Sequence, residues 1–365
     1  MNISFVDLKT QYERIKNKID SRIQKVLEHG QYILGPEVRE LENTLASYTG
    51  SKYCITVSSG TEALLISLLS IEIQPGDEVI TSPFSFISAS EVIKLLGAIP
   101  VFVDIDIKTC NLNPEMLEKA ITKKTKAIIP ISLFGQTADM DEVNLIAKKY
   151  NDIVVIEDAA QSFGAEYKGK KSCNLSKIGC TSFFPSKTLG CFGDGGAIFT
   201  NDDKIAKLCY EIRVHGQPKK YIHTSIGVGG RMDTIQCAVL LEKIKILDSE
   251  LKARRLIAKK YDEFFDVNNI PRVQQHSFCL SSYSLYTIFW KQDRELAIND
   301  LRNAGIPTAV HYPKIITDQN PYKEYSKQKF PSALEASRSV LSIPMHPYLT
   351  SKQQEKIMNK ILSIA

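Results

Sequence analysis

The pattern of apolar positions between residues 50 and 200 alternates short β-branched runs with stretches at helical spacing. Residues 52–57 form one run, and the leucines and isoleucines after it recur every three or four residues. Further runs lie in DEVITS, IPVFVDID, KAIIPISLFG, DIVVIEDAA and GAIFTN, most of them separated by helical stretches. Strands that alternate with helices predict an α/β fold whose mainly parallel sheet is covered on both faces.

The second part of the chain shows a different order of elements. Helical spacing runs from about residue 234 to 265, a strand pattern covers residues 283–290, and a helix pattern covers residues 294–305 and ends at Gly305. No repeat, low-complexity segment or long linker interrupts the chain. We therefore predict a large domain over residues 1–245 and a smaller C-terminal α/β domain over residues 246–365.

Composition narrows the classes of protein that fit this pattern. The chain has 365 residues, of which 43% are hydrophobic, so a large core can form. Its net charge is +5, and no basic block carries interleaved aromatic residues, which argues against nucleic-acid binding. The N-terminal MNISFVDLKTQYERIKNK is charged early, unlike a signal peptide, and no apolar run approaches the roughly 18 residues that span a bilayer. We expect neither nucleic acid nor a membrane as a partner.

The spacing of cysteine and histidine gives no support to a metal site. The eight cysteines are scattered and form no CxxC pair, and the six histidines show no HExxH-like spacing. Unpaired thiols are typical of a reducing compartment. The sequence therefore predicts a cytoplasmic protein that binds no metal.

One lysine has mainly apolar and aromatic neighbours in the sequence. The stretch SFFPSKTLGCFGDGGAIFTN places Lys187 near Phe183, Phe184, Leu189 and Phe192. Burial disfavours the charged form of lysine, and the neutral amine can form a Schiff base with an aldehyde. The alternative is a surface lysine whose stem packs on these side chains while its head reaches water.

Two predicted strand ends carry polar groups, and ligands of open α/β sheets bind beyond such ends. VSSGTEALL places residues 58–61 at the start of a helix, where free N–H groups bind phosphate, although an ordinary helix N-cap has the same sequence. VVIEDAAQSFGA places Asp158 at the end of a strand and Gln161 one short turn later. A carboxylate there can hold a protonated ring nitrogen, cap a helix or bind a metal.

A third strand end, PFSFISAS, carries Phe84 and Phe86. An aromatic face can cover a flat cofactor, although aromatic residues more often belong to the core. Together, a phosphate cradle, an aromatic plate, a carboxylate and an apolar lysine are the parts that hold pyridoxal 5′-phosphate (PLP). In that interpretation Lys187 traps the cofactor aldehyde, and Asp158 keeps the pyridine nitrogen protonated so that the ring acts as an electron sink.

The order of these motifs resembles a known family. SSGT, EDAAQSFGA, FFPSK and GDGGA stand as in the sugar aminotransferases of the DegT/DnrJ/EryC1/StrS family, which have the aspartate-aminotransferase-like fold (PLP fold type I). The resemblance covers nearly the whole chain, from FVDLKTQY and HGQYILGPEV to PTAVHYP and SIPMHPYL. Within the family, the chain is most similar to the branch that aminates C3 of UDP-linked 2-acetamido-3-oxo-glucuronic acid.

By matching position, the resemblance implies a role for each motif residue. Lys187 and Asp158 are the catalytic pair and also contact the cofactor, one at the aldehyde and the other at the pyridine nitrogen. The other cofactor contacts are Gln161 beside the ring hydroxyl, Phe86 stacked on the ring, and Gly60, Thr61 and Ser182 at the phosphate. The matched substrate positions, some reached across a dimer interface, are Gly30, Tyr32, His215, Arg231, His311 and Tyr312.

The sequence departs from the family pattern at one position. Many relatives carry an asparagine two residues before the arginine of GGRMD, and the neighbouring subunit uses it to contact the cofactor phosphate. This chain has Gly229 there, so no side chain can make that contact, and the phosphate is either held less tightly or supported by backbone groups and water.

The resemblance implies a homodimer with shared active sites that moves an amino group from L-glutamate to a nucleotide-linked keto-sugar. PLP is the expected cofactor, and pyridoxamine 5′-phosphate is its intermediate form. The most similar branch points to C3 of a UDP-2-acetamido-3-oxo-hexose or hexuronate, for surface polysaccharide or glycan biosynthesis. Arg231 is a natural cation for a carboxylate, either on glutamate or on a uronic acid.

Other activities stay open at this point. A dTDP- or UDP-linked 3-keto- or 4-keto-6-deoxyhexose is an alternative substrate, and a non-catalytic PLP-binding regulator is an alternative of another class. Such regulators usually carry a DNA-binding module, and the chain has no basic helix-turn-helix segment. Sugar dehydratases of the same family replace the lysine with histidine, so Lys187 argues against that activity.

Overall fold

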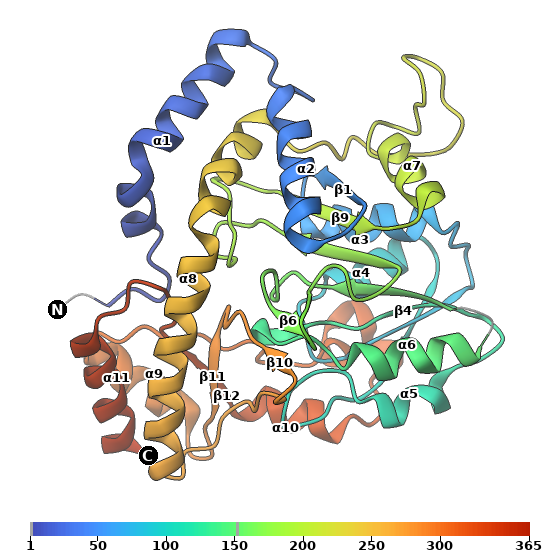
Figure 1. Ribbon diagram of the computed structural model, residues 1–365. Coiled ribbons are helices and arrows are strands. Elements are labelled where there is room, and N and C mark those ends of the chain that lie inside the picture. The colour runs from blue at the N-terminus through green and yellow to red at the C-terminus, as the bar shows by residue number, and fades with distance from the viewer. Residues whose placement is uncertain (1–2, 151–152) are drawn as a thin grey trace.

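The computed structural model describes residues 3–150 and 153–365. A seven-stranded sheet with the order β1-β9-β8-β5-β4-β2-β3 forms the centre of the larger part (Figure 1). Its strands are β1 (Tyr53–Val57), β2 (Glu78–Thr81), β3 (Ile99–Phe102), β4 (Thr125–Ile129), β5 (Val154–Asp158), β8 (Ile178–Ser182) and β9 (Gly196–Thr200). Strand β9 is antiparallel to β1 and β8, and the other neighbouring pairs are parallel. The predicted mainly parallel sheet is confirmed.

Helices cover this sheet because its strands are apolar on both faces. Every residue of β9 is buried, and so are four of the five residues of β5. The surrounding helices are α2 (Pro36–Thr49), α3 (Gly60–Ser70), α4 (Ser88–Leu95), α5 (Pro114–Ala120), α6 (Met140–Lys149) and α7 (Asp203–Ile212), with a 3₁₀ turn η1 (Leu133–Gly135). A small side sheet contains β6 (Glu166–Tyr167), β7 (Lys170–Lys171) and β10 (Cys279–Leu280). Burial on both faces is what parallel sheets require.

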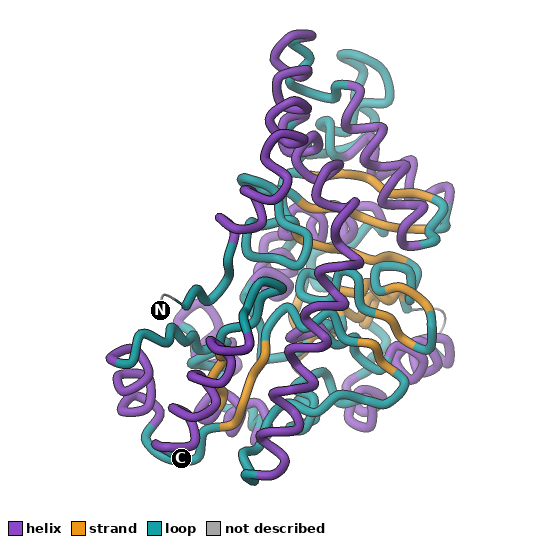
Figure 2. Tube along the Cα trace, turned by 60° about the vertical axis from the view of Figure 1, so that its left-hand side comes forward, coloured by secondary structure: helices purple, strands orange, loops and turns teal. Residues whose placement is uncertain are grey.

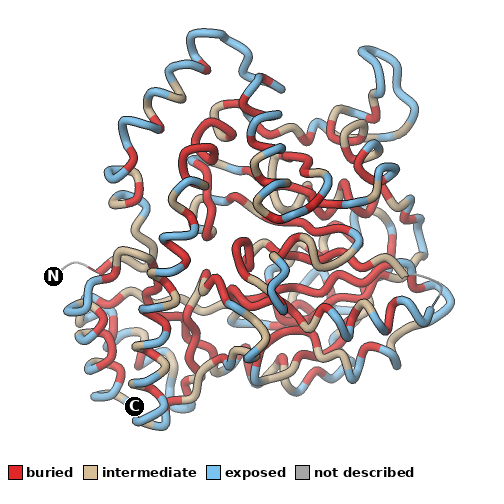
Figure 3. The backbone as a smooth tube through the Cα atoms, in the orientation of Figure 1, coloured by how far each residue is buried: buried red, intermediate tan, exposed pale blue. Residues whose placement is uncertain are grey.

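Two long helices lie beside each other at one side of the molecule. Helix α8 (Thr234–Val267) runs from the larger part into the C-terminal part, and α1 (Leu8–His29) lies along its first half (Figures 1 and 2). Ile15 and Ile19 of α1 pack on Val239 of α8. Much of the rest of α1 is exposed, as Figure 3 shows.

The C-terminal part has its own apolar core. Its elements are β11 (Tyr286–Phe289), α9 (Arg294–Asn303), η2 (Ile316–Asp318), η3 (Asn320–Tyr325), α10 (Pro331–Ser339), β12 (Val340–Ile343) and α11 (Ser351–Ile364). Strands β11 and β12 pair antiparallel. The second half of α8, α9 and α11 pack around them, and Ile3 of the N-terminal segment joins this cluster.

The predicted strands and helices are present, with differences at particular points. The run DIVVIEDAA forms β5, although Asp152, where the prediction begins, lies outside the described residues. Strand β8 was not predicted, because its sequence IGCTS has no long β-branched run. The predicted boundary after residue 245 lies inside α8, while Ile315 and Ile316 pack into the core of the larger part. The division into two domains stays a prediction.

Two further observations concern the described residues only. None of their helices combines the length and the apolar character that crossing a bilayer requires. Residues 3–150 and 153–365 also contain no group of three or more His, Cys, Asp or Glu side chains arranged to hold a metal ion.

Candidate active site

A cavity of about 730 Å³ lies at the carboxyl ends of the parallel strands. Residues that follow β1, β2, β4, β5 and β8 line it, which is where ligands of open α/β sheets bind. Nine of the thirteen predicted site residues line this cavity: Gly60, Thr61, Phe86, Asp158, Gln161, Ser182, Lys187, His311 and Tyr312.

Lys187 lies in the loop after β8, which helix α8 holds in place. The Phe192 N–H donates to Oε1 of Gln236 at 2.8 Å, and Nζ of Lys243 donates to the Gly190 carbonyl at 2.7 Å. Burial lowers the pKa of Lys187 below its usual value of 10.5, and the nearby Asp158 carboxylate opposes this shift only in part. A larger fraction of the amine is therefore neutral and nucleophilic than in a solvated lysine.

Asp158 is the last residue of β5, and its carboxylate is buried beside Lys187. Oδ1 accepts the Ala160 N–H at 3.0 Å, and none of the described residues donates to Oδ2. Burial raises the pKa of Asp158, while the Ala160 N–H and the charge of Lys187 act in the opposite direction. A cationic ring nitrogen at Oδ2 would favour the ionised carboxylate, because opposite charges lower the pKa of an acid.

Gln161 and Tyr312 connect the loop after β5 to the C-terminal part. Oε1 of Gln161 accepts the Phe134 N–H at 3.0 Å, and its Nε2 donates to the Tyr312 hydroxyl at 3.0 Å. The ring of Tyr312 lies 6.4 Å from the ring of Phe86. Both ends of the Gln161 amide are therefore used within the protein, and they fix its orientation at the cavity.

The start of α3 provides free backbone donors next to Ser182. Ser59 caps the helix by accepting the Glu62 N–H at 3.0 Å, whereas no described residue accepts the N–H groups of Gly60 and Thr61. A Cβ at Gly60 would lie 2.7 Å from Cβ of Ser182, so only glycine allows this close approach. The unpaired N–H groups at a helix N-terminus form a site for an anion.

These groups fit the shape and charges of PLP. Gly60 and Thr61 offer donors to a phosphate, and Asp158 offers a carboxylate to the ring nitrogen. Phe86 lines the cavity with 59% of its surface exposed, which leaves an aromatic face available to a ring. Lys187 offers an amine to an aldehyde.

The other four predicted residues do not line this cavity. Gly30 and Tyr32 lie in the loop between α1 and α2, which pairs with the segment before α8: the Thr234 N–H donates to the Tyr32 carbonyl at 3.0 Å. Arg231 belongs to the same segment, and His215 lies beside Gly229. The four residues are thus outside the pocket of their own chain, and their substrate contacts stay predictions.

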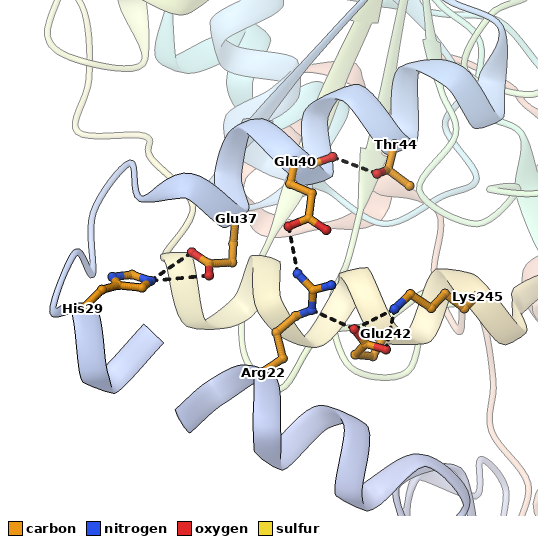
Figure 4. Close-up of polar contacts among 7 residues, drawn as sticks. All are labelled: Arg22, His29, Glu37, Glu40, Thr44, Glu242 and Lys245. Carbon is orange, nitrogen blue, oxygen red and sulfur yellow. Dashed lines mark hydrogen bonds and ion pairs between the residues drawn. The ribbon is translucent and has the colours of Figure 1, made fainter. Parts of the chain in front are cut away.

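Ion pairs of Arg22 and a contact between His29 and Glu37 hold the helices around this loop. Nε of Arg22 on α1 lies 2.7 Å from Glu242 on α8, and its Nη1 lies 2.8 Å from Glu40 on α2 (Figure 4). His29 at the end of α1 lies 3.3 Å from Glu37 at the start of α2. These contacts fix the helices on either side of the loop that carries the exposed Tyr32.

Some residues to which the motif analysis gave no role also line the cavity. Phe5 and Val6 of the N-terminal segment line the cavity, and the Phe5 ring lies 6.3 Å from the His311 ring. Ser284 and Leu285 approach from the segment before β11. The motif FVDLKTQY was the only signal for Phe5, because nothing in its local pattern indicates that the N-terminus folds back to the pocket.

Comparisons with known proteins agree with this geometry. The model of the DegT/DnrJ/EryC1/StrS aminotransferase family matches residues 13–362. The chain is 53% identical over 357 residues to the UDP-2-acetamido-2-deoxy-3-oxo-D-glucuronate aminotransferase of Pseudomonas aeruginosa, covering 95% of this chain and 96% of that protein.

Solved structures share the fold over nearly the whole chain. A DegT/DnrJ/EryC1/StrS aminotransferase from Brucella abortus superposes with a TM-score of 0.96 at 39% identity, covering 99% of both chains. NtdA from Bacillus subtilis, with bound cofactor PMP, superposes with a TM-score of 0.89 at 29% identity, covering 95% of this chain and 81% of that one. The predicted aspartate-aminotransferase-like fold is confirmed.

Proposed function

Because the chain belongs to the DegT/DnrJ/EryC1/StrS aminotransferase family, we propose that it is a PLP-dependent enzyme that aminates C3 of a UDP-linked 2-acetamido-3-oxo-hexuronate. The amino donor in this proposal is L-glutamate. The observation that carries the proposal is the 53% identity to the glucuronate aminotransferase, together with a lysine–aspartate pair in a cavity at the strand ends. The product is an amino-sugar nucleotide suited to surface polysaccharide synthesis.

Different residues of the cavity would transfer the proton and stabilise the charge of the cofactor ring. When bound, PLP would supply an aldehyde for the amino group and a ring that withdraws electrons from the carbon that loses a proton. Lys187 would hold that aldehyde at rest, and its free amine would take the proton from the α-carbon of glutamate. In the second half-reaction the same amine delivers a proton to the sugar C3. Asp158 holds a positive charge at the pyridine nitrogen during both steps.

The second part of the proposal is a homodimer with shared sites. Apolar side chains are exposed on two loops, one between α1 and α2 and the other between α7 and α8. The exposed fractions are 48% for Tyr32, 52% for Ile33, 80% for Tyr221 and 86% for Ile226. Exposed apolar groups of this kind are typical of a surface that another protein covers. A second copy that covers these loops would bring its Arg231 to the cavity, where a guanidinium fits the carboxylate of a uronic acid or of glutamate.

The small number of cationic side chains in the cavity of one chain supports a contribution from a second chain. Lys187 is the only lysine or arginine among the residues that line the described cavity. A substrate with a diphosphate and a carboxylate needs more cations than that, and the partner's surface is the source that we propose.

We also place the enzyme in the cytoplasm, which its eight free cysteines support.

A spectroscopic and a substrate test address the proposal. The purified protein, loaded with PLP, should lose the absorbance of its lysine-bound cofactor when glutamate is added, and Lys187→Ala should show no such change. A non-catalytic regulator would keep its spectrum. In a panel of nucleotide keto-sugars, the UDP-linked 3-oxo-hexuronate should have the highest kcat/KM. Preference for a dTDP-linked or 4-keto-6-deoxy sugar would contradict the assigned substrate.

Arg231 offers a sharper test of the carboxylate. Arg231→Lys keeps the charge but loses the paired N–H groups, so it should raise KM for the hexuronate more than KM for the matching hexose. Equal effects on both sugars would mean that Arg231 does not read the C6 carboxylate.

A further inference from the structure

The segment that carries His311 is attached to β12 by backbone pairing. The Ala309 N–H donates to the Ser342 carbonyl at 3.1 Å, and the Ser342 N–H donates to the Ala309 carbonyl at 2.8 Å. Strand β12 in turn pairs with β11, where Thr287 stands opposite Ser342. His311, Ser342 and Thr287 are therefore brought together from three neighbouring segments.

Their side chains form a line of hydrogen bonds that leads to the cavity. Nδ1 of His311 lies 3.1 Å from Oγ of Ser342, and Oγ of Ser342 lies 3.0 Å from Oγ1 of Thr287. Ser342 is fully buried and Thr287 is 3% exposed. Among the described residues, these hydroxyl groups have no other hydrogen-bond partner, and their burial shields their protons from bulk water.

The direction of these hydrogen bonds follows from the supply of protons. Each hydroxyl has one proton and can accept bonds as well. Thr287 has a single partner, and a buried donor without an acceptor is rarer and more costly than an acceptor without a donor. If Thr287 donates to Ser342 and Ser342 donates to Nδ1 of His311, both hydroxyl protons have an acceptor, whereas the opposite direction leaves the Thr287 proton without one.

His311 is neutral in this environment. Burial lowers its pKa to about 4, with a further contribution from the nearby charge of Lys187. A neutral imidazole carries one N–H, so a ring that accepts at Nδ1 has its proton on Nε2. Since Nδ1 is bonded to Ser342 and His311 lines the cavity, Nε2 is the nitrogen left for a ligand.

We propose that Ser342 is a positioning residue that holds His311 as the Nε2–H tautomer, so that the cavity presents a hydrogen-bond donor to an oxygen of the sugar. This step rests on the proposed function. A donor at Nε2 cannot take a proton from Lys187, so proton transfer stays with the lysine. It selects an acceptor, such as a ketone or an acetamido oxygen, over an N–H or an ammonium group.

The tautomer can be measured without any turnover. In protein labelled with ¹⁵N-histidine at pH 8, the His311 signal, assigned with His311→Gln, should be that of an Nε2–H imidazole. Thr287→Val should leave this tautomer unchanged, because Ser342 then has only His311 to donate to. If the line ran in the opposite direction, the parent would show Nδ1–H and Thr287→Val would convert it to Nε2–H, which overturns the proposal.

Ser342→Ala should allow the neutral His311 ring to adopt both tautomers and should weaken binding of the sugar. A neutral hydrogen bond contributes about 0.5–1.5 kcal/mol, so KM for the keto-sugar should rise about two- to twelvefold, while the half-reaction with glutamate keeps its rate. Thr317→Val is the matched control, because it removes a buried threonine hydroxyl that has no partner among the described residues. It should leave both the tautomer and KM unchanged.

The His311 tautomer and the KM for the keto-sugar together distinguish a failure of the Ser342 proposal from a failure of the proposed function. An Nε2–H signal in the parent that persists in Ser342→Ala would overturn the positioning role, whatever the activity. Release of the tautomer without a rise in KM would overturn the sugar contact. Inactivity of the parent toward every keto-sugar would instead contradict the proposed function, while the tautomer measurement would still decide the role of Ser342.

Discussion

Gly229→Asn tests how this chain holds its cofactor without the asparagine that many relatives carry. The backbone of Gly229 does not have the positive φ that favours glycine. A Cβ there would lie 3.2 Å from Cε1 and 3.3 Å from Nε2 of His215, and 3.6 Å from Nη2 of Arg231. Space for an asparagine therefore exists if the His215 ring moves by a few tenths of an ångström.

The size of the effect follows from two opposing contributions. A hydrogen bond to a charged phosphate contributes about 1.5–3 kcal/mol. Holding the amide at the phosphate displaces the His215 ring from its preferred rotamer, which costs about 0.5–1.5 kcal/mol. The difference between the middles of the two ranges is about 1.25 kcal/mol, which corresponds to somewhat less than tenfold tighter binding of the cofactor.

Titration calorimetry with pyridoxamine 5′-phosphate measures this difference, because that form has no covalent bond to Lys187. The control is Gly229→Ala, which introduces the same Cβ beside His215 but no amide. We expect binding close to that of the parent for alanine and nearly tenfold tighter binding for asparagine, by the free-energy difference above. If both variants bind as the parent does, or if asparagine binds more weakly, backbone or water contacts already fill this role and the reasoning is refuted.

Substitutions at four further positions test the site and its surroundings. Lys187→Ala and Lys187→Arg should each abolish transamination in a folded protein, because neither side chain can form the imine at neutral pH; substantial turnover in either would remove the lysine from the mechanism. Asp158→Asn should lower kcat by about a hundredfold or more, and activity within a few-fold of the parent would make Asp158 only a turn cap. Gly60→Ala, whose Cβ would lie 2.7 Å from Cβ of Ser182, should lower the unfolding free energy by about 1–3 kcal/mol and weaken phosphate binding in the same titration. Burial raises the pKa of Glu157 to about 7 from 4.5, so the folded carboxyl keeps its proton where the unfolded one has lost it. The unfolding free energy should therefore fall as pH rises through this interval, by on the order of 2–3 kcal/mol; urea unfolding at pH 5 and pH 8 should show that Glu157→Gln removes this dependence.

The sequence alone indicated most strands of the large sheet and the polar residues expected at their carboxyl ends. Apolar runs that alternate with helical stretches predict a parallel sheet, and the carboxyl ends of parallel strands meet at one edge. Asp158 and Gly60 could be placed there because each follows an apolar run by two or three residues. Lys187 could be placed there because its apolar neighbours and the family motif indicated an amine shielded from water. Such inferences need only local patterns and one topological rule.

The tertiary structure decided which residues from distant segments come together. The pairing of Thr287 with Ser342, and of Ser342 with Ala309, sets the orientation of His311. Periodicity carries no information about such partners, which are more than thirty residues apart in the sequence. The loop of Tyr32 and the segment of Arg231 likewise pair with each other, outside the cavity of their own chain. Side-chain spacing reports which face of an element is buried, whereas the partner on that face depends on how the whole chain packs.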